Sequence, residues 1–146
     1  MTEDMPLKVV LDTNIVVSVA LSSDGNPARI FEMLLYGKIK NYTSKEILEE
    51  IKQVMEREKI RKIINFEDKE FIINTFERVS EKISPEKRYE IIKDDPKDNK
   101  FIECAVSASA NYIISGDEHL LNLKEFNNIK IISPADFVNL VEETND

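Results

Sequence analysis

The chain carries at residues 8–14 the run KVVLDTN, in which a short apolar stretch stops at a carboxylate. Lys8–Leu11 is rich in valine and indicates a short buried β-strand. The residues from Asn14 to Leu21 then have helical character. In α/β proteins, ligands bind where strands of this kind end. Asp12, at the end of the predicted strand, is therefore the first candidate for a functional side chain.

Further short apolar strands alternate with helices along the rest of the chain. Asn26-Pro27 and Gly37 mark the two ends of one helix, and Thr43–Glu46 matches a capping box that opens another. This alternation predicts an α/β fold, a three-layer α/β/α sandwich with a mainly parallel central sheet. The predicted helices are 27–36, 44–57, one from about 67, 98–110, 117–121 and 134–141, and the predicted strands are 8–11, 38–42, 112–115 and 130–132.

The composition excludes several classes of protein. The length predicts a single domain over residues 1–146, with its core at about 8–141, and 42% apolar residues exclude global disorder. One cysteine, Cys104, excludes a disulfide framework, and one histidine, His119, argues against a metal site built from histidines. No apolar run approaches the ~18–20 residues of a membrane span. Met1–Lys8 does not lead into the apolar stretch of a secretory signal, so we expect a cytoplasmic protein that does not contact membranes.

Two further aspartates are predicted to lie at the same edge of the sheet as Asp12. Asp117 follows the predicted strand 112–115, and Asp98 opens a long apolar helix. Parallel strands end at a common edge, where ligands gather. Asp12, Asp98 and Asp117 could each instead be only a helix N-cap, which is a favoured position for Asp.

Glu50 is the fourth candidate, on the helix predicted from Ser44. At about 100° per residue it points about 100° from the centre of the apolar face, at the border of the buried surface. Glu49, about 160° from that centre, is predicted to face solvent. A carboxylate at the border can reach the end of the sheet. It can also extend to water or pair with a lysine, and the helix geometry alone leaves both interpretations open.

Four carboxylates at one place would repel each other and need a cation. A hard divalent ion such as Mg²⁺ or Mn²⁺ prefers oxygen ligands and retains some waters. Such an ion neutralises phosphate groups and lowers the pKa of an attacking water. The acidic set therefore favours phosphoryl chemistry that depends on a divalent metal.

The acidic residues lie in stretches that resemble the motifs of PIN-domain nucleases. The resemblance runs from about Lys8 to Val141, and four motifs occur in the family's order. The closing IISPADF at 131–137 matches the subgroup described as VapC-like toxins of toxin–antitoxin pairs. The four motifs are VVLDTN at 9–14, SKEILEEI at 44–51, DPKDNKFIECA at 95–105 and YIISGDEHLL at 112–121.

The resemblance implies a PIN-like fold and an endoribonuclease that cleaves single-stranded RNA and depends on Mg²⁺ or Mn²⁺. It implies an antitoxin protein and a second copy of the chain, in a homodimer, as partners. It also places the metal-binding and catalytic carboxylates at Asp12, Glu50, Asp98 and Asp117, with Asn14 and Ser115 as supporting polar residues.

Two other functions stay open. The chain could be a PIN scaffold with weak or no catalysis that acts through a protein partner. It could also be a metal-dependent phosphatase or phosphoacceptor domain, since these use Asp at strand ends as well. The haloacid-type phosphatase pattern requires a second Asp two residues after the first, and here that position is Asn14. The phosphatase interpretation therefore ranks last.

The net charge limits how RNA could bind. The chain has 28 acidic residues against 20 basic ones, a net charge of −8. This surplus argues against a protein that coats nucleic acid, because neutralising phosphates requires a basic surface. Without the four candidate ligands, 24 acids remain against 20 bases. The acidity therefore does not exclude RNA as a substrate.

Other residues that carry chemistry are expected to have structural or surface roles. Asp95 is interpreted as a turn residue before a proline rather than as a fifth acid. Cys104 is expected to act as a small buried hydrophobe and His119 as an exposed residue at a helix start. Lys97 and Lys100, which flank Asp98, are expected to be solvated.

Three phenylalanines are expected to fill the core or a subunit contact rather than to stack on bases, since nothing places them near the acids. Two of them belong to the apolar repeat that predicts the helix from about residue 67, and the third lies near the C-terminus. The phenylalanines are Phe71, Phe76 and Phe126, and the repeat also includes Ile72, Val79 and Ile83.

Overall fold

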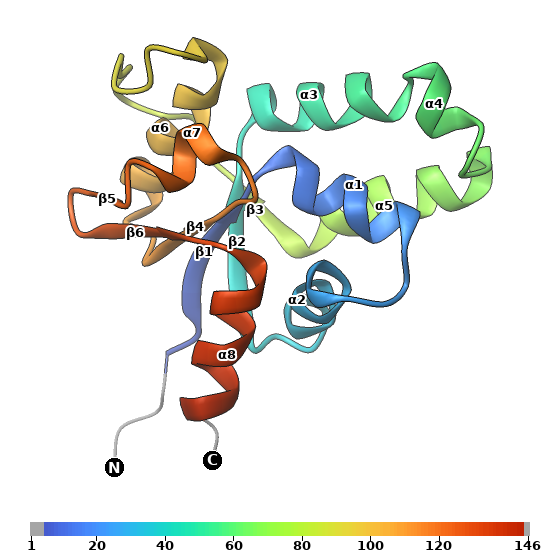
Figure 1. Cartoon of the computed structure of the whole chain (residues 1–146), viewed down its shortest axis with the longest axis horizontal. Helices are drawn as coiled ribbons and strands as arrows, with labels where there is room; N and C mark the ends of the chain where they lie inside the picture. Colours follow the sequence, from blue (N-terminus) through green and yellow to red (C-terminus); the bar gives the residue numbers. More distant parts are fainter. Residues whose placement is uncertain (1–4, 145–146) are drawn as a thin grey trace.

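A mainly parallel sheet runs through the middle of the computed structural model, which describes residues 5–144 (Figure 1). Within these residues the sheet has six strands in the order β3-β2-β1-β4-β6-β5, and only β5 is antiparallel to its neighbour. The predicted α/β class and mainly parallel sheet are confirmed. The strands are β1 Leu7–Leu11, β2 Ile39–Thr43, β3 Ser80–Lys82, β4 Tyr112–Ile114, β5 Glu125–Phe126 and β6 Ile129–Ile132.

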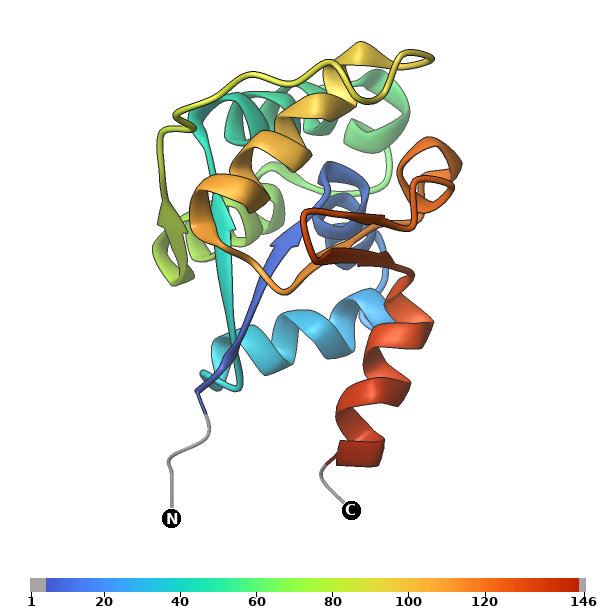
Figure 2. The same cartoon turned by 90° about the vertical axis from the view of Figure 1, so that its left-hand side faces the viewer.

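Helices cover both faces of this sheet. Helix α6 packs on β1, β2 and β4 from one side, while α1, α2 and α5 lie on the other side (Figures 1 and 2). The three layers expected from the alternating sequence pattern are therefore present. The helices are α1 Thr13–Leu21, α2 Asn26–Leu35, α3 Lys45–Met55, α4 Glu58–Arg61, α5 Phe66–Val79, η1 Pro96–Asp98 (a 3₁₀ turn), α6 Asn99–Ala108, α7 Glu118–Leu121 and α8 Pro134–Thr144.

The strand order places a crevice between β1 and β4. The chain adds β2 and β3 on one side of β1 and then returns to add β4 on the other side. Where the order reverses, the connections leave the sheet in opposite directions and open a crevice at the carboxyl ends of the strands. Leu11 pairs with Ile114, so the next residues, Asp12 and Ser115, lie side by side at that crevice.

Helix α5 and the strand after it correct one expectation from the sequence. The helix ends at Val79, so Ile83 is not part of it, and Ser80–Lys82 forms β3 in parallel with β2. The backbone groups at the outer edge of β2 require hydrogen-bond partners, and β3 supplies them. Phe76 is fully buried as predicted, whereas Phe71 is 65% exposed and does not fill the core.

No helix within residues 5–144 is long and apolar enough to cross a membrane. Residues 1–4 of the segment inspected for a secretory signal lie outside the described part of the chain.

Candidate functional site

A pocket of about 140 Å³ opens at the carboxyl ends of β1 and β4. It lies at the point where the strand order reverses, which is where ligands of open α/β sheets bind. Strand ends, the second half of α3 and the start of α6 all contribute to its wall. All four carboxylates proposed from the sequence line this pocket, namely Asp12, Glu50, Asp98 and Asp117, and Asp95 lines it as well.

Asp12 directly follows β1 and is only 2% exposed. Its Oδ1 accepts the backbone N–H groups of Asn14 at 2.7 Å and Ile15 at 3.3 Å, so it is the N-cap of α1. Its Oδ2 accepts the hydroxyl of Ser115. Burial raises the pKa of Asp12, and these hydrogen bonds lower it in part. The capping interpretation is thus correct, and the same side chain also lines the pocket.

Ser115 connects the ends of the two central strands. Its hydroxyl donates to Asp12 and accepts the backbone N–H of Asp117 at 2.9 Å. Asp117 in turn accepts the N–H of His119 at 2.8 Å and caps the short helix α7. Asn14 lines the pocket with an exposed side chain and contacts Asp12 through its backbone N–H.

Glu50 reaches the pocket from α3, with its side chain 20% exposed. Glu49 is exposed, so the prediction from helical geometry that Glu50 is the border residue is confirmed. The two carboxylate oxygens of Glu50 have different partners. Oε1 accepts the hydroxyl of Thr13, and Oε2 pairs with the Lys100 ammonium at 2.9 Å.

Lys100 corrects the expectation that the lysines near Asp98 are solvated. It is only 8% exposed, because the first turn of α6 brings it against Glu50 of α3. Its ammonium also donates to the Lys97 carbonyl at 2.8 Å and lies 5.2 Å from the centre of the Phe101 ring. Lys100 is therefore the resident cation beside Glu50.

Asp98 and Asp117 come together with Asp95. Each of the three offers a carboxylate oxygen, and these oxygens lie within 4.8 Å of one another. Asp12 and Glu50 line the same pocket without belonging to this close group. Asp98 stands at the N-cap position of α6, but its side chain makes no capping hydrogen bond. Its Oδ2 is buried and has no hydrogen-bond partner.

Asp95 corrects another expectation. The turn interpretation is accurate for its backbone, since its carbonyl accepts the N–H of Asp98 at 2.9 Å at the start of the η1 turn. Its half-buried side chain nevertheless faces the pocket with the other acids. The spacing of three residues from Asp98 was the signal in the sequence that could have indicated this.

The electrostatics of this group fit a hard divalent cation. Burial, together with the neighbouring Asp117 and Asp95 carboxylates, raises the pKa of Asp98 to about 8, although Lys100 acts in the opposite direction. The group offers only oxygen donors, which suit Mg²⁺ or Mn²⁺. The buried Asp98 Oδ2 without a partner is the kind of atom that a bound cation satisfies.

We expect the stability of the metal-free protein to fall as the pH rises from about 4 to about 8. The pKa of Asp98 in the folded chain, about 8, lies above its ordinary value of 3.8, so folding favours its protonated form. That stabilisation is complete below the ordinary value and is lost as Asp98 ionises. Urea unfolding at pH 5 and pH 8 with a chelator measures it. Asp98→Asn should have a smaller loss between the two pH values, and an equal loss in both proteins would contradict the assignment.

Other side chains at the pocket are absent from the sequence-based set. Thr13 and Lys100 hold Glu50, and Phe101 forms part of the wall. Arg57 and Lys97 line the pocket with exposed side chains. Arg57 follows Glu50 by seven residues, two helical turns, and this spacing could have indicated a shared face.

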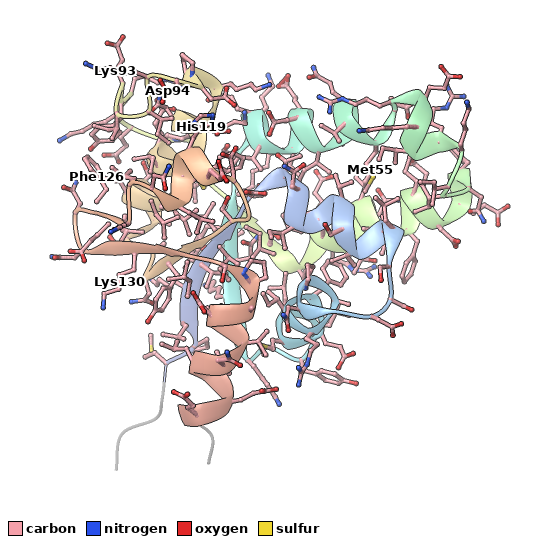
Figure 3. The ribbon with its side chains drawn as sticks, viewed as in Figure 1. Met55, Lys93, Asp94, His119, Phe126 and Lys130 are labelled. Atoms are coloured by element: carbon pink, nitrogen blue, oxygen red, sulfur yellow. The ribbon has the colours of Figure 1, made fainter. Side chains whose placement is uncertain are left out.

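Cys104 and His119 lie where the sequence predicts them. Cys104 is fully buried, and burial raises the pKa of its thiol to about 12, so it is not a reactive thiolate. His119 is exposed at the start of α7, and its Nδ1 lies 3.8 Å from an Asp94 carboxylate oxygen (Figure 3). Neither side chain lines the pocket.

Comparison with known proteins identifies a family and a curated relative. The profile of the family described as "PIN domain" matches residues 8–119. The uncharacterized protein MJ1680 of Methanocaldococcus jannaschii is 33% identical over 150 residues, which covers 97% of this chain and 96% of that protein.

Two solved structures share the fold. One is the crystal structure of VapBC2 from Rickettsia felis bound to a DNA fragment from their promoter. It has a TM-score of 0.61 and 16% identity, and the match covers 87% of this chain and 98% of that chain. The other is PAE2754 from Pyrobaculum aerophilum, with a TM-score of 0.64 and 11% identity over 93% of this chain and 90% of that chain.

Proposed function

This chain belongs to the PIN domain family, and from that premise we propose that it is a metal-dependent endoribonuclease that hydrolyses single-stranded RNA. The observation that carries the proposal is the group of three carboxylates at the carboxyl ends of the central strands, which includes the buried Asp98 oxygen without a partner. Phosphate oxygens are negatively charged, so these three carboxylates would repel them. A bound cation is required to offset that repulsion.

Asp98, Asp117 and Asp12 would hold the divalent ion. Ser115 fixes the relative position of two of them, because its hydroxyl contacts the Asp12 side chain and the Asp117 backbone at once. When bound, the ion would neutralise the phosphate and lower the pKa of the attacking water. The chain itself supplies the charges and the rigid strand ends.

Glu50 would orient the attacking water. Its two oxygens are held by Thr13 and Lys100, so the carboxylate has one defined orientation at the pocket wall. A carboxylate fixed in this way can accept a proton from a water that enters the pocket. Lys100 holds the carboxylate in place, because its ammonium lies 2.9 Å from Oε2.

Arg57 and Lys97 would contact the RNA backbone. Both are exposed and line the pocket, so their charges can approach the phosphates on either side of the reacting one. A pocket of about 140 Å³ suits one phosphodiester group rather than a base pair. These basic side chains supply the local attraction that a chain with a net charge of −8 requires for RNA.

We also propose that the chain is the toxin of a toxin–antitoxin pair and binds an antitoxin protein. The fold it shares with VapBC2, together with the VapC-like closing motif at 131–137, supports this proposal. Exposed apolar side chains offer a surface for a protein contact, either with an antitoxin or with a second copy of the chain. They are Leu21, Ile63, Phe66 and Phe71, of which Leu21 and Phe71 line a second pocket of about 220 Å³.

Cleavage of single-stranded RNA in the presence of Mn²⁺ tests the proposal. Wild-type protein should cleave the RNA, and a chelator should abolish the cleavage. Asp12→Asn should cleave about a hundredfold more slowly, because the amide oxygen can still accept the two backbone N–H groups but the negative charge is lost. Asp24→Asn, an exposed aspartate outside the pocket, is the matched control. Equal rates for wild type and Asp12→Asn would rule out this mechanism.

A further inference from the structure

Asp95 has a half-buried carboxylate that the fold does not use. It stands at the N-cap position of η1, but its side chain makes no capping hydrogen bond. Among residues 5–144, no basic side chain forms an ion pair with it, whereas the adjacent Asp94 is exposed and faces His119. A partly buried carboxylate without a partner is costly unless a cation reaches it.

Two neighbouring carboxylates complete a possible binding site for such a cation. Oxygens of Asp95, Asp98 and Asp117 lie within 4.8 Å of one another, close enough for one ion to contact all three. Asp98 is 5% exposed, and its Oδ2 is buried without a hydrogen-bond partner. The group therefore combines mutual repulsion with a buried oxygen that requires a ligand.

The other two carboxylates of the pocket already have partners within the chain. Glu50 pairs with the Lys100 ammonium at 2.9 Å and accepts a hydrogen bond from Thr13. Asp12 accepts two backbone N–H groups and the Ser115 hydroxyl. The Asp95 carboxylate and the Oδ2 of Asp98 have no such partner among the described residues, and both lie with Asp117 at one end of the pocket.

The turn that carries Asp95 is held rigidly by Asn99. The Asn99 Oδ1 accepts the N–H groups of Ile91 at 3.0 Å and Ile92 at 2.8 Å. Its Nδ2 donates to the carbonyls of Ile92 at 3.0 Å and Pro96 at 2.9 Å. Through these four hydrogen bonds, Asn99 holds the chain both before Asp95 and after it. Asn99 is the first residue of α6 and directly follows Asp98. The distance between the two aspartates is therefore defined by the fold before any ion binds.

We propose that Asp95 is a ligand of the divalent cation, which binds at the end of the pocket formed by Asp95, Asp98 and Asp117. Glu50 is paired instead with the ammonium of Lys100. The inference rests on the proposed metal-dependent function and adds a ligand to the set that the family resemblance implies. It also predicts a single tight divalent site per chain, because the ammonium of Lys100 occupies the position beside Glu50.

Calorimetric titration with Mn²⁺ alone, on the full chain, tests this assignment. Asp95→Asn should weaken Mn²⁺ binding by about tenfold or more, because the ion loses one charged ligand. Asp94→Asn is the matched control, since it removes a neighbouring exposed carboxylate, and it should change the affinity less than about twofold. Wild type should bind one Mn²⁺ with high affinity.

Two measurements separate the possible failures. Thermal unfolding in a chelator should show that Asp95→Asn is as stable as wild type or more so, since it removes a repulsive charge. If Asp95→Asn is folded and binds Mn²⁺ like wild type while Asp98→Asn binds weakly, Asp95 is not a ligand and the proposed function stands. If Asp98→Asn also binds like wild type, the metal site and the proposed function fail together.

Discussion

Replacing Asp98 with Asn is expected to reduce RNA cleavage about a thousandfold and to leave the chain folded. Asp98 is the most buried member of the close carboxylate group, and its Oδ2 has no protein partner. No helix cap depends on its side chain. The substitution therefore removes a charge that the pocket requires for the ion, while α6 loses no capping hydrogen bond.

The measurement is the initial rate of cleavage of a single-stranded RNA over a range of Mn²⁺ concentrations. Saturating Mn²⁺ should restore only a small part of the lost rate, because the carbonyl oxygen of Asn is a weaker ligand than a carboxylate. Asp136→Asn, an exposed aspartate at the start of α8 and outside the pocket, should keep the wild-type rate. A rate for Asp98→Asn within tenfold of wild type would show that the chemistry occurs elsewhere.

Replacing Phe76 with Ala is expected to lower the free energy of unfolding by about 3–5 kcal/mol. The Phe76 ring is fully buried on α5, and truncation leaves a cavity that the packed layers on either side cannot fill. The melting temperature should drop by roughly 10 °C or more. Urea denaturation measures the change. The slope of the free energy of unfolding against urea concentration is compared between the variant and the wild type.

Phe71→Ala on the same helix is the matched control. Phe71 is 65% exposed, so its truncation should change the free energy of unfolding by less than about 0.5 kcal/mol. The two substitutions remove the same atoms from the same helix, so a difference between them reports burial alone. Similar losses for both would mean that α5 packs differently from the structure described above.

Local patterns in the sequence were sufficient to predict most of the fold. The valine-rich run at Lys8–Leu11 forms β1, and α3 begins where the Thr43–Glu46 pattern predicts a helix start, although its N-cap is Ser44 and not Thr43. Helical geometry alone distinguished the half-buried Glu50 from the exposed Glu49, because the period of 3.6 residues determines which face each residue shares. The strand β3 was not predicted, since a strand of three residues has too little pattern of its own.

The surroundings of the site could not be predicted in the same way. Lys97 and Lys100 are both lysines beside Asp98, yet one is exposed and the other is buried against Glu50. Asp94 and Asp95 are adjacent aspartates, yet one faces His119 and the other lines the pocket. Nothing in the local pattern separates the members of either pair, because their difference comes from elements packed against them.

The sequence by itself determined the order of most strands and helices, the class of fold and the acids that stand at the strand ends, since periodicity and caps act between residues a few positions apart. Only the tertiary structure decided which groups meet. Ser115 and Asp12 are 103 positions apart, Lys100 and Glu50 are 50 apart, and Glu50 and Thr13 are 37 apart. These contacts exist because parallel strands end at one edge of the sheet and α6 packs across it, and such packing depends on the whole chain at once.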